Sequence, residues 1–192
     1  MDKKKTCSWP SNNPMMIAYH DKEWGVPLHD DMKIFEFLVL DAFQAGLSWS
    51  IVLKKREGFR KAFDHFDYKK IARYKEDKIQ QLLKDEGIIR NQLKIRATVN
   101  NAQRFLEVQK EFGTFDKYIW SFVDGKTIMN GFTDLKQIPA RSPESDLMSK
   151  DLKKRGFSFV GSTICYAFMQ AAGMVNDHLV DCYRYQVLKK LK

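Results

Sequence analysis

Residues 30–43 of this 192-residue chain read DDMKIFEFLVLDAF, and this stretch decides the fold class. Its apolar side chains, such as Ile34 and Phe37, recur at three-and-four spacing, which places them on one face of a helix. Asp30 or Asp31 is available as the N-cap, because an aspartate side chain accepts hydrogen bonds from the first free amides of a helix. The stretch therefore predicts a helix packed against a core.

The same spacing continues along most of the chain, and it predicts an all-α protein. Glycines are sparse, and the alternation of β-branched residues that marks strands is almost absent. We expect further helices over residues 57–63, 68–74, 78–84, 92–109, 142–155 and 162–174. We expect a single domain over residues 1–192 with two helical lobes, and a disordered basic tail over residues 186–192.

The charge of the chain favours a polyanionic partner. Lys and Arg number 33 against 24 Asp and Glu, so the net charge is +9. Such a charge favours nucleic acid through neutralisation of phosphates, although solubility alone would also account for it. No uninterrupted apolar run approaches the roughly 20 residues of a membrane helix, and three cysteines are too few for a disulfide framework. We therefore expect no membrane partner and a reducing, cytoplasmic location. A monomer is the default expectation for the oligomeric state.

A second stretch, HLVDC at residues 178–182, places a histidine and a cysteine four residues apart. On a helix the two side chains would share one face, and together they would supply half of a tetrahedral zinc site. The alternative is that His178 caps a helix end and that Cys182 is a core thiol.

The rest of the cysteine and histidine inventory leaves two partners for this pair. Cys165 lies in an apolar stretch and is explained by core packing, while His29 and His65 lie among acidic residues and are explained as surface residues. Cys7 and His20 remain. Two cysteines and two histidines leave no open position on the metal, which is the pattern of a structural site that pins the two ends of the chain together. The predicted ligand set is Cys7, His20, His178 and Cys182.

The predicted helix over residues 30–43 carries one acid on its apolar face. Asp41 lies four residues after Phe37 and three after Leu38. A buried carboxylate without a partner is costly. Either a local base pairs with Asp41, or the carboxylate is directed at a ligand.

Five blocks of sequence, collinear along the chain, resemble those of the 3-methyladenine DNA glycosylase I family. They are AYHDKEWGVP at 18–27, QAGLSWSIVLKKRE at 44–57, GIIRNQLKI at 87–95, MSKDLKKRGFSFVG at 148–161 and VNDHLVDC at 175–182. The resemblance extends over residues 7–182. It implies an all-α, helix-hairpin-helix DNA glycosylase fold with a structural Zn²⁺ that joins the N- and C-terminal segments. The ligands that it implies are Cys7, His20, His178 and Cys182.

The resemblance also implies an activity. This is hydrolysis of the N-glycosidic bond of 3-methyladenine in alkylated double-stranded DNA, which initiates base excision repair and releases free 3-methyladenine. Such an enzyme extrudes the nucleotide and reads it with aromatic rings and polar contacts. The methylated base is cationic and departs as a neutral leaving group, so little acid catalysis is needed and water is the nucleophile. No lysine has a sequence context that argues for a Schiff base, so we expect a monofunctional enzyme.

The family's pocket positions fall on Trp9, Tyr19, Asp41 and Trp49, which are the expected substrate-binding residues. Asp41 is the expected catalytic residue, as the electrostatic partner of the cationic base. The family has a glutamate at Asp41 and its best-known members an aromatic residue at Met16. The carboxylate here is therefore one methylene shorter, and the pocket has one stacking surface less. Core packing is the alternative explanation for each aromatic residue.

The resemblance also points to a DNA-binding surface. Gly46 and Leu47 fall where the family approaches the gap left by the extruded base, and Gly87 falls at the turn of the hairpin that offers amides to a phosphate. Each basic residue is also explained as a solvated charge, and Gly87 as a helix C-cap. The candidate DNA-binding residues are Gly46, Leu47, Gly87, Arg90, Lys94 and Lys153.

Two other functions are weighed against the enzyme. The first is a non-catalytic, zinc-stabilised DNA-binding helical module that retains the fold, which the departures at Asp41 and Met16 would permit. The second is a zinc hydrolase. It is disfavoured because four protein ligands leave no position for an activated water.

Overall fold

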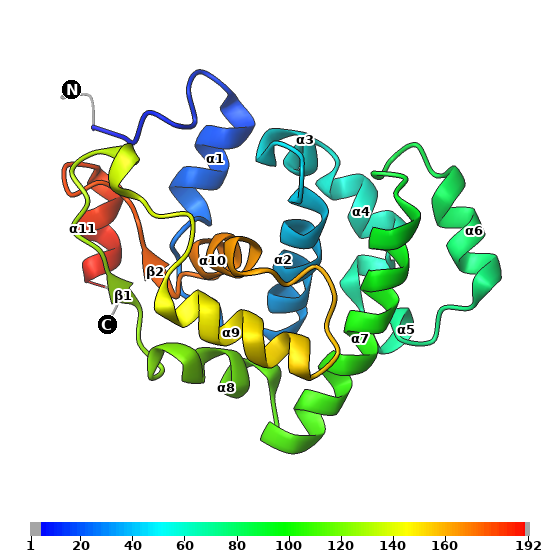
Figure 1. Ribbon diagram of the computed structural model, residues 1–192. Helices are drawn as coiled ribbons and strands as arrows, with labels where there is room; N and C mark the ends of the chain where they lie inside the picture. Colours follow the sequence, from blue (N-terminus) through cyan, green and yellow to red (C-terminus); the bar gives the residue numbers. More distant parts are fainter. Residues whose placement is uncertain (1–4, 191–192) are drawn as a thin grey trace.

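The computed structural model describes residues 5–190 and is mostly helical (Figure 1). Three short 3-10 helices, η1 (Asp64–Phe66), η2 (Ser121–Val123) and η3 (Leu135–Gln137), and two short parallel strands, β1 (Ile128–Met129) and β2 (Val175–Asn176), complete it. The predicted helical fold class is confirmed. The α-helices are α1 (Pro14–Lys22), α2 (Asp31–Gln44), α3 (Trp49–Lys54), α4 (Arg56–Ala62), α5 (Tyr68–Ile71), α6 (Glu76–Lys84), α7 (Gln92–Phe112), α8 (Phe115–Trp120), α9 (Pro143–Lys154), α10 (Ser162–Ala171) and α11 (Tyr183–Lys189).

Local sequence sets the helix ends. The amide of Lys33 donates to Asp30 Oδ1 at 2.9 Å, so Asp30 is the N-cap of α2. Ser142 caps α9, and Pro143 occupies its first turn, where the missing amide costs nothing. Helix α9 ends before Gly156, whose φ of +85° suits a glycine. Both helices begin where the sequence predicts.

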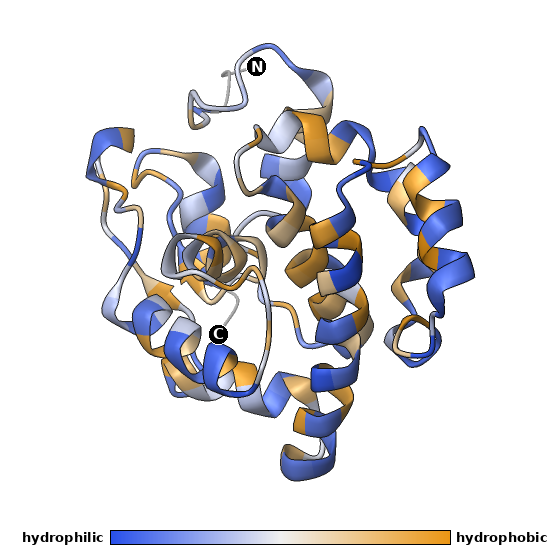
Figure 2. Ribbon diagram, turned by 45° about the vertical axis from the view of Figure 1, so that its right-hand side comes forward, coloured by the Kyte–Doolittle hydropathy of each residue, from blue (hydrophilic) through white to orange (hydrophobic). Residues whose placement is uncertain are grey.

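Helix α2 runs through the centre of the molecule, and every residue from Ile34 to Phe43 is buried. Helix α10 packs against both α2 and α9. Large side chains such as Phe35 and Phe168 are fully buried, and each contributes about 1.5–3 kcal/mol by leaving water. The outer helices carry alternating hydrophilic and hydrophobic bands (Figure 2). The core therefore holds α2, and Asp41 with it, from several sides.

Helices α6 and α7 pack against each other and are joined by residues 85–91, the hairpin turn. The turn rests on α4, where a Cβ added to Gly58 would lie 2.1 Å from the carbonyl oxygen of Gly87. Backbone therefore meets backbone, which only a glycine at position 58 allows. Lys55 Nζ also donates to the Glu86 carbonyl at 2.7 Å. The turn is thus braced by α4 and its flanking lysine.

The two ends of the described chain lie side by side. The amide of Tyr183 donates to the carbonyl of Lys5 at 2.9 Å, and the Lys5 ammonium pairs with Asp181. Figure 1 shows the N-terminal segment and α11 at the same side of the molecule. No helix within residues 5–190 is long and apolar enough to cross a membrane.

The prediction of a helix through residues 178–182 is wrong. These residues form a turn before α11. The amide of His178 donates to Asn176 Oδ1 at 3.2 Å, and the amide of Cys182 donates to the Leu179 carbonyl at 2.8 Å. The Asn176 side chain thus bonds the backbone two residues further along the chain. Asparagine side chains that bond nearby backbone groups in this way compete with the hydrogen bonds of a helix.

The prediction of a disordered tail from residue 186 is wrong for residues 186–189. They complete α11, and Leu188 on this helix is buried against the body of the protein. An apolar contact of this kind outweighs the repulsion between the neighbouring lysines. Lys190 is the C-cap of α11, and residues 191–192, the end of the predicted tail, lie outside the described residues.

Candidate functional site

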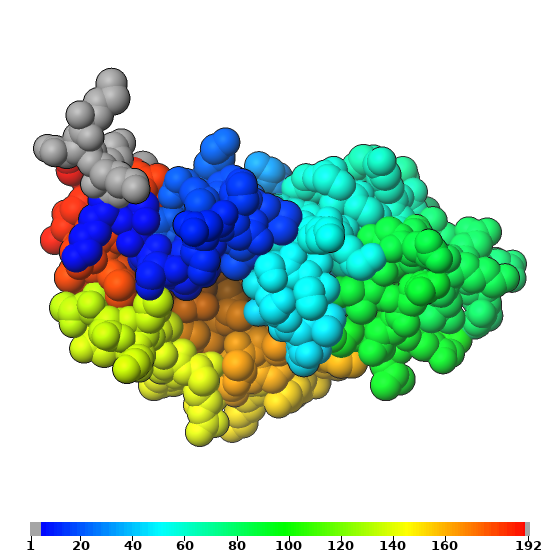
Figure 3. Space-filling view, turned by 90° about the horizontal axis from the view of Figure 1, so that it is seen from above, coloured from blue at the N-terminus to red at the C-terminus, as the bar shows by residue number. Residues whose placement is uncertain are grey.

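A hollow opens between the N-terminal segment, the loop after α2 and the loop that carries η3, with α10 beneath it (Figure 3). We call it the base pocket, and its cavity has a volume of about 380 Å³. Its lining residues are Trp9, Met16, Tyr19, Trp24, Asp41, Gln44, Trp49, Leu135, Ile138, Ala167 and Gln170. The structure thus brings together the four residues that the sequence assigns to substrate binding, Trp9, Tyr19, Asp41 and Trp49.

Asp41 is 2% exposed, and its Oδ2 has no hydrogen-bond partner among the described residues. Burial raises the pKa of the Asp41 carboxyl well above its usual range, and the Arg56 guanidinium lowers it by less. Arg56 is not its partner, because its guanidinium is bound to Glu23 at 2.7 Å and to Glu36 at 2.6 Å. No base within residues 5–190 pairs with Asp41, so a ligand is the remaining explanation for an acid on this face.

Two further polar atoms at the base pocket lack partners. The indole Nε1 atoms of Trp9 and Trp49 are buried and bond to no described residue. The rings of Tyr19 and Trp49 have centroids 5.1 Å apart at an interplanar angle of 49°, and Trp9 meets Tyr19 edge-on at 6.4 Å. Because the rings of Tyr19 and Trp49 touch, a flat ligand would lie against the wall they form and not between them.

The three unpartnered atoms define the chemistry of a ligand. An indole N–H only donates, whereas a carboxylate accepts and, when protonated, also donates. A complementary ligand is flat, offers acceptor atoms to Trp9 and Trp49, and brings a positive charge or a donor to Asp41. A cation at this point would also favour the ionised carboxylate, because an opposite charge lowers a carboxyl pKa. The base pocket therefore suits a cationic heteroaromatic ring.

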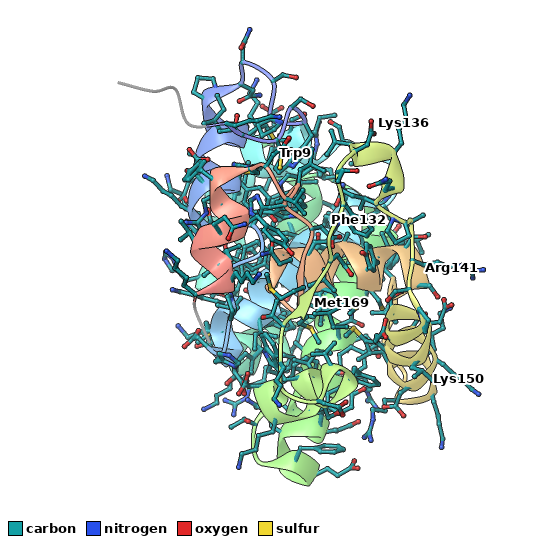
Figure 4. The ribbon with its side chains drawn as sticks, turned by 90° about the vertical axis from the view of Figure 1, so that its left-hand side faces the viewer. Trp9, Phe132, Lys136, Arg141, Lys150 and Met169 are labelled. Atoms are coloured by element: carbon teal, nitrogen blue, oxygen red, sulfur yellow. The ribbon has the colours of Figure 1, made fainter. Side chains whose placement is uncertain are left out.

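Several lining residues escaped prediction from sequence. Gln44 carried a signal, since it lies three residues after Asp41 on the same helix. Trp24 belongs to the same N-terminal group of aromatic residues as Trp9 and Tyr19, but the sequence favoured core packing for it. The η3 loop has no periodic pattern. Figure 4 shows Lys136 of this loop pointing away from the molecule, and Leu135 and Ile138 of the same loop line the base pocket. The lining residues that the sequence did not predict are Trp24, Gln44, Leu135, Ile138, Ala167 and Gln170.

A larger cavity, of about 660 Å³, lies beside Tyr19 and is lined by charged residues. Arg56 pairs there with Glu23 and Glu36, and Arg60 pairs with Glu36 at 2.9 Å. None of the buried polar atoms that lack a partner in residues 5–190 lines this cavity. Its two arginines are paired with glutamates, whereas the unpartnered buried polar atoms lie at the smaller base pocket, so that pocket is the better candidate for ligand binding.

The predicted cluster of cysteines and histidines is confirmed. The ligand atoms of Cys7, His20, His178 and Cys182 lie within 4.8 Å of one another, and all four residues are buried. His178 Nδ1 is 3.1 Å from His20 Nε2 and 3.6 Å from Cys182 Sγ, and Cys7 Sγ is 3.8 Å from His178 Nδ1. A tetrahedral ion bound to two nitrogens and two sulfurs would space its ligands about 3.3–3.8 Å apart. The four side chains therefore fit a metal ion.

The outer nitrogen of each histidine is also held. His20 Nδ1 lies 2.7 Å from Asp21 Oδ1, and His178 Nε2 lies 3.0 Å from the carbonyl oxygen of Trp24. A carbonyl only accepts, so Nε2 of His178 carries the hydrogen and Nδ1 is left for a metal. Outer partners of this kind fix the orientation of histidine ligands in metal sites. We call the set of two cysteines and two histidines the metal cluster. Their four ligand atoms converge on one point, and the outer nitrogen of each histidine has a partner in the protein.

Most of the candidate DNA-binding residues lie on the surface. Gly46, Leu47, Gly87, Arg90 and Lys153 are exposed. Gly46 has a φ of +78° and open space where a Cβ would lie, so its backbone is accessible from outside. The Leu47 side chain, 38% exposed, is one of the larger apolar groups left at the surface. These positions permit contact with a large partner.

The hairpin turn has three free amides. The Gly87 amide donates to Asp85 Oδ1 at 2.7 Å, so it is already used inside the turn. The amides of Glu86, Ile89 and Arg90 have no acceptor within residues 5–190. The prediction that Gly87 marks the turn is confirmed, while the free amides belong to the residue before it and to two residues after it.

The prediction that Lys94 contacts DNA is wrong. Lys94 is only 7% exposed, and its ammonium donates to the carbonyl oxygens of Phe43 at 2.8 Å and Ala45 at 2.6 Å. An ammonium committed to two buried carbonyls is out of reach of a phosphate. The basic pattern around the hairpin turn gave no sign of this, because burial of a lysine depends on which elements pack above it.

Comparisons with known proteins agree on one family. A family model described as methyladenine glycosylase matches residues 9–185. The chain is 49% identical over 179 residues to DNA-3-methyladenine glycosylase 1 of Escherichia coli strain K12, covering 93% of this chain and 96% of that protein. A crystal structure of a 3-methyladenine DNA glycosylase I matches with a TM-score of 0.91 at 49% identity, over 93% of this chain and 98% of that one. A single-residue variant of such an enzyme, in complex with 3-methyladenine, matches with a TM-score of 0.90 at 34% identity, over 93% and 96%. The chain therefore belongs to the methyladenine glycosylase family.

Proposed function

We propose that this chain is a monofunctional DNA-3-methyladenine glycosylase. It hydrolyses the N-glycosidic bond of 3-methyladenine in double-stranded DNA, releases the free base and so initiates base excision repair. The observation that carries the proposal is Asp41, whose buried Oδ2 lacks a partner in a pocket walled by aromatic rings. An enzyme that acts on a base inside a duplex must extrude it and read it by stacking and polar contacts.

The charge of the substrate explains why an unpaired acid is useful. Methylation at N3 makes adenine cationic, and a cation supplies the partner that Asp41 lacks. Neutral adenine still offers its N6 amino group as a donor, but it brings no positive charge to a buried carboxylate, so its pairing with Asp41 is weaker. As the glycosidic bond breaks, the base becomes neutral and positive charge passes to the sugar, where a nearby anion stays favourable. Water then attacks the sugar, and no lysine is assigned to a Schiff base.

Two residues of the base pocket differ from the family pattern, and they change how far the pocket side chains extend towards a bound base. Asp41 is one methylene shorter than the family glutamate, and Met16 lines the cavity where an aromatic ring is expected. Methionine is unbranched and adapts its shape to the space that it fills. We propose that the base lies closer to α2 than a longer acid would allow, with Met16 closing the space on the other side.

We propose that the metal cluster holds Zn²⁺ as a structural ion. Two thiolates and two imidazoles are a ligand set that zinc favours, and four protein ligands leave no open position for chemistry. The Trp24 ring, which lines the base pocket, packs against His178 with centroids 4.6 Å apart. The ion would therefore support the pocket wall from behind without touching the base.

We propose that α6, the hairpin turn and α7 form the helix-hairpin-helix motif that holds a DNA phosphate. The free amides of Ile89 and Arg90 would donate to the phosphate, and the side chains of Arg90 and Lys153 would add charge. Gly46 and Leu47 would enter the gap left by the extruded base. One chain supplies every residue of the site, so we propose a monomer that acts in the cytoplasm, where its unpaired thiols stay reduced.

The direct test is base release from methylated DNA. Duplex DNA treated with a methylating agent is incubated with the protein, and the released bases are identified by chromatography. We expect free 3-methyladenine, abasic sites without strand cleavage, and no release from untreated DNA. A Trp49→Ala variant run beside it should lose release and keep its affinity for the duplex. Binding to methylated DNA without any release would contradict the proposal and favour a non-catalytic DNA-binding module.

A further inference from the structure

Lys94 is a buried cation without a carboxylate partner. It stands in the first turn of α7, and only 7% of it is exposed. Its ammonium donates to two backbone carbonyls, Phe43 at 2.8 Å and Ala45 at 2.6 Å. Burying an ammonium is costly unless its hydrogen bonds are replaced. The two residues whose carbonyls accept from the Lys94 ammonium therefore indicate the role of this side chain.

Both acceptors belong to the end of α2. The last carbonyls of a helix have no partner within the helix, and a cation there also interacts favourably with the helix dipole. Helix α2 ends at Gln44, with Ala45 as its C-cap, and has no basic residue in its own last turn. Lys94 therefore supplies, from another helix, the cation that the end of α2 lacks.

The end of α2 is where the base pocket meets the surface. Asp41 lies one turn before it, and residues 45–49, which we call the pocket lip, follow it with Gly46 at a φ of +78° and Trp49 at the start of α3. The position of the pocket lip relative to Asp41 thus depends on how the chain leaves α2. Lys94 holds that point directly through Ala45.

The backbone of Lys94 is tied to the hairpin turn as well. Asn91, the last residue of the turn, caps α7 by accepting from the Lys94 amide at 3.1 Å. The same residue therefore bonds the hairpin turn through its amide and the pocket lip through its side chain. On the other side of the turn, Lys55 holds Glu86. The hairpin turn and the pocket lip are thus linked by one rigid path.

We propose that Lys94 is a positioning residue that sets the pocket lip in register with the hairpin turn. When the hairpin turn holds a phosphate of the DNA, the pocket lip is then positioned so that the extruded base faces Asp41 and Trp49. The inference rests on the proposed glycosylase function. It differs from a phosphate-contact role, because Lys94 would act after DNA is bound and without touching it.

The test separates binding from base release. Single-turnover release of 3-methyladenine at saturating methylated duplex is measured together with the dissociation constant for the duplex, for the wild type and for Lys94→Met. We expect release to fall on the order of 10- to 100-fold, since a displacement of about 1 Å can cost that much. We expect the dissociation constant to change by less than about 3-fold, because the ammonium makes no contact with DNA.

Two further variants serve as controls. Lys110→Met makes the same substitution at the other, exposed end of α7 and should match the wild type in both measurements. Arg90→Ala should show the opposite pattern, with a larger loss of affinity for the duplex than of release at saturation. Wild-type release by Lys94→Met, or a loss of affinity as large as its loss of rate, would overturn the inference. If the wild type itself released no base, the proposed function would fail instead.

A measurement on the wild type covers the case in which Lys94→Met does not fold. Hydrogen exchange of residues 45–49 is followed with and without an undamaged duplex. If Lys94 links the two regions, binding at the hairpin turn should slow exchange at the Ala45 amide, which donates to the Ala42 carbonyl inside the protein. Unchanged exchange at this amide, with the duplex bound, would overturn the inference.

Discussion

The metal cluster and the base pocket are built from the same stretch of α1, yet they treat their polar atoms in opposite ways. Tyr19 lines the base pocket, and its neighbour His20 belongs to the metal cluster. In the metal cluster the outer nitrogen of each histidine has a partner, whereas three buried polar atoms at the base pocket have none. A site for a permanent ion is completed by the protein, while a site for a passing ligand leaves open the bonds that the ligand must make.

The two sites share one wall. The Trp24 ring lies 4.6 Å from His178 of the metal cluster and 5.0 Å from Trp9 of the base pocket, between ring centroids. Damage to the metal cluster should therefore reach the base pocket, whereas changes in the base pocket should leave the metal cluster intact. Mutations in the metal cluster should therefore have larger effects than mutations in the base pocket.

The largest effect is expected from Cys182→Ser. Loss of a thiolate ligand should remove the metal and lower the free energy of unfolding by on the order of 5 kcal/mol, because metal binding contributes directly to folding. Metal content and thermal stability are measured on the same preparation. Cys165→Ser is the matched control, since Cys165 is a buried thiol outside the metal cluster. One metal per chain in Cys182→Ser would contradict the ligand assignment.

Asp41→Asn should remove most of the activity and none of the metal. We expect single-turnover release of 3-methyladenine to fall by about 10²–10³-fold, the usual cost of losing one electrostatic partner of the transition state. Affinity for undamaged duplex and metal content should equal those of the wild type. Release at the wild-type rate would mean that the carboxylate has no part in the reaction.

Asp41→Glu tests the fit of the shorter acid with a smaller effect. The longer side chain restores the family residue, and one methylene in a pocket changes binding by about 10-fold or somewhat more. We expect release to be retained and affinity for free 3-methyladenine to change within that range. A fall to the level of Asp41→Asn would show that the pocket is fitted to the shorter acid.

The smallest effect concerns stability and pH. Burial raises the pKa of Asp41 in the folded protein, so the folded state keeps a proton that the unfolded chain releases above about pH 4. The wild type therefore loses stability as the pH rises from about 4 through the raised pKa, and Asp41→Asn lacks this loss. Denaturant titrations of both proteins should show the stability difference in favour of Asn growing with pH. A difference that does not vary with pH would contradict a raised pKa.

Helix ends and the metal cluster were predictable because their signals are local or combinatorial. Asp30 and Ser142 cap helices through bonds to amides within three residues, which a sequence can show. The metal cluster followed from a short inventory, in which Cys7 and His20 were left once other residues had been explained. The prediction held even though residues 178–182 form a turn, since a metal site needs converging atoms and not a particular backbone.

The features that the sequence did not predict depend on packing between segments that are distant along the chain. Lys94 was expected at the surface because nothing near it in sequence indicates that the end of α2 covers it. The η3 residues Leu135 and Ile138 reach the base pocket from a segment without periodicity. Helices α1 and α3 are short, and α1 follows a proline-containing segment. Neither helix has enough turns to show the three-and-four spacing of apolar residues that predicts a helix.

The metal cluster also fixes an order of assembly during translation. Cys7 and His178 are 171 residues apart, so the first ligands leave the ribosome long before their partners exist. Until then Trp9 and Trp24 have no support from the C-terminal segment, and the early thiol is open to oxidation. Once the chain has folded around α2 the two ends lie side by side, so binding of the proposed ion adds little further loop-closure entropy. Capture of the proposed ion would thus be a late event, which requires that both ends of the nascent protein have met.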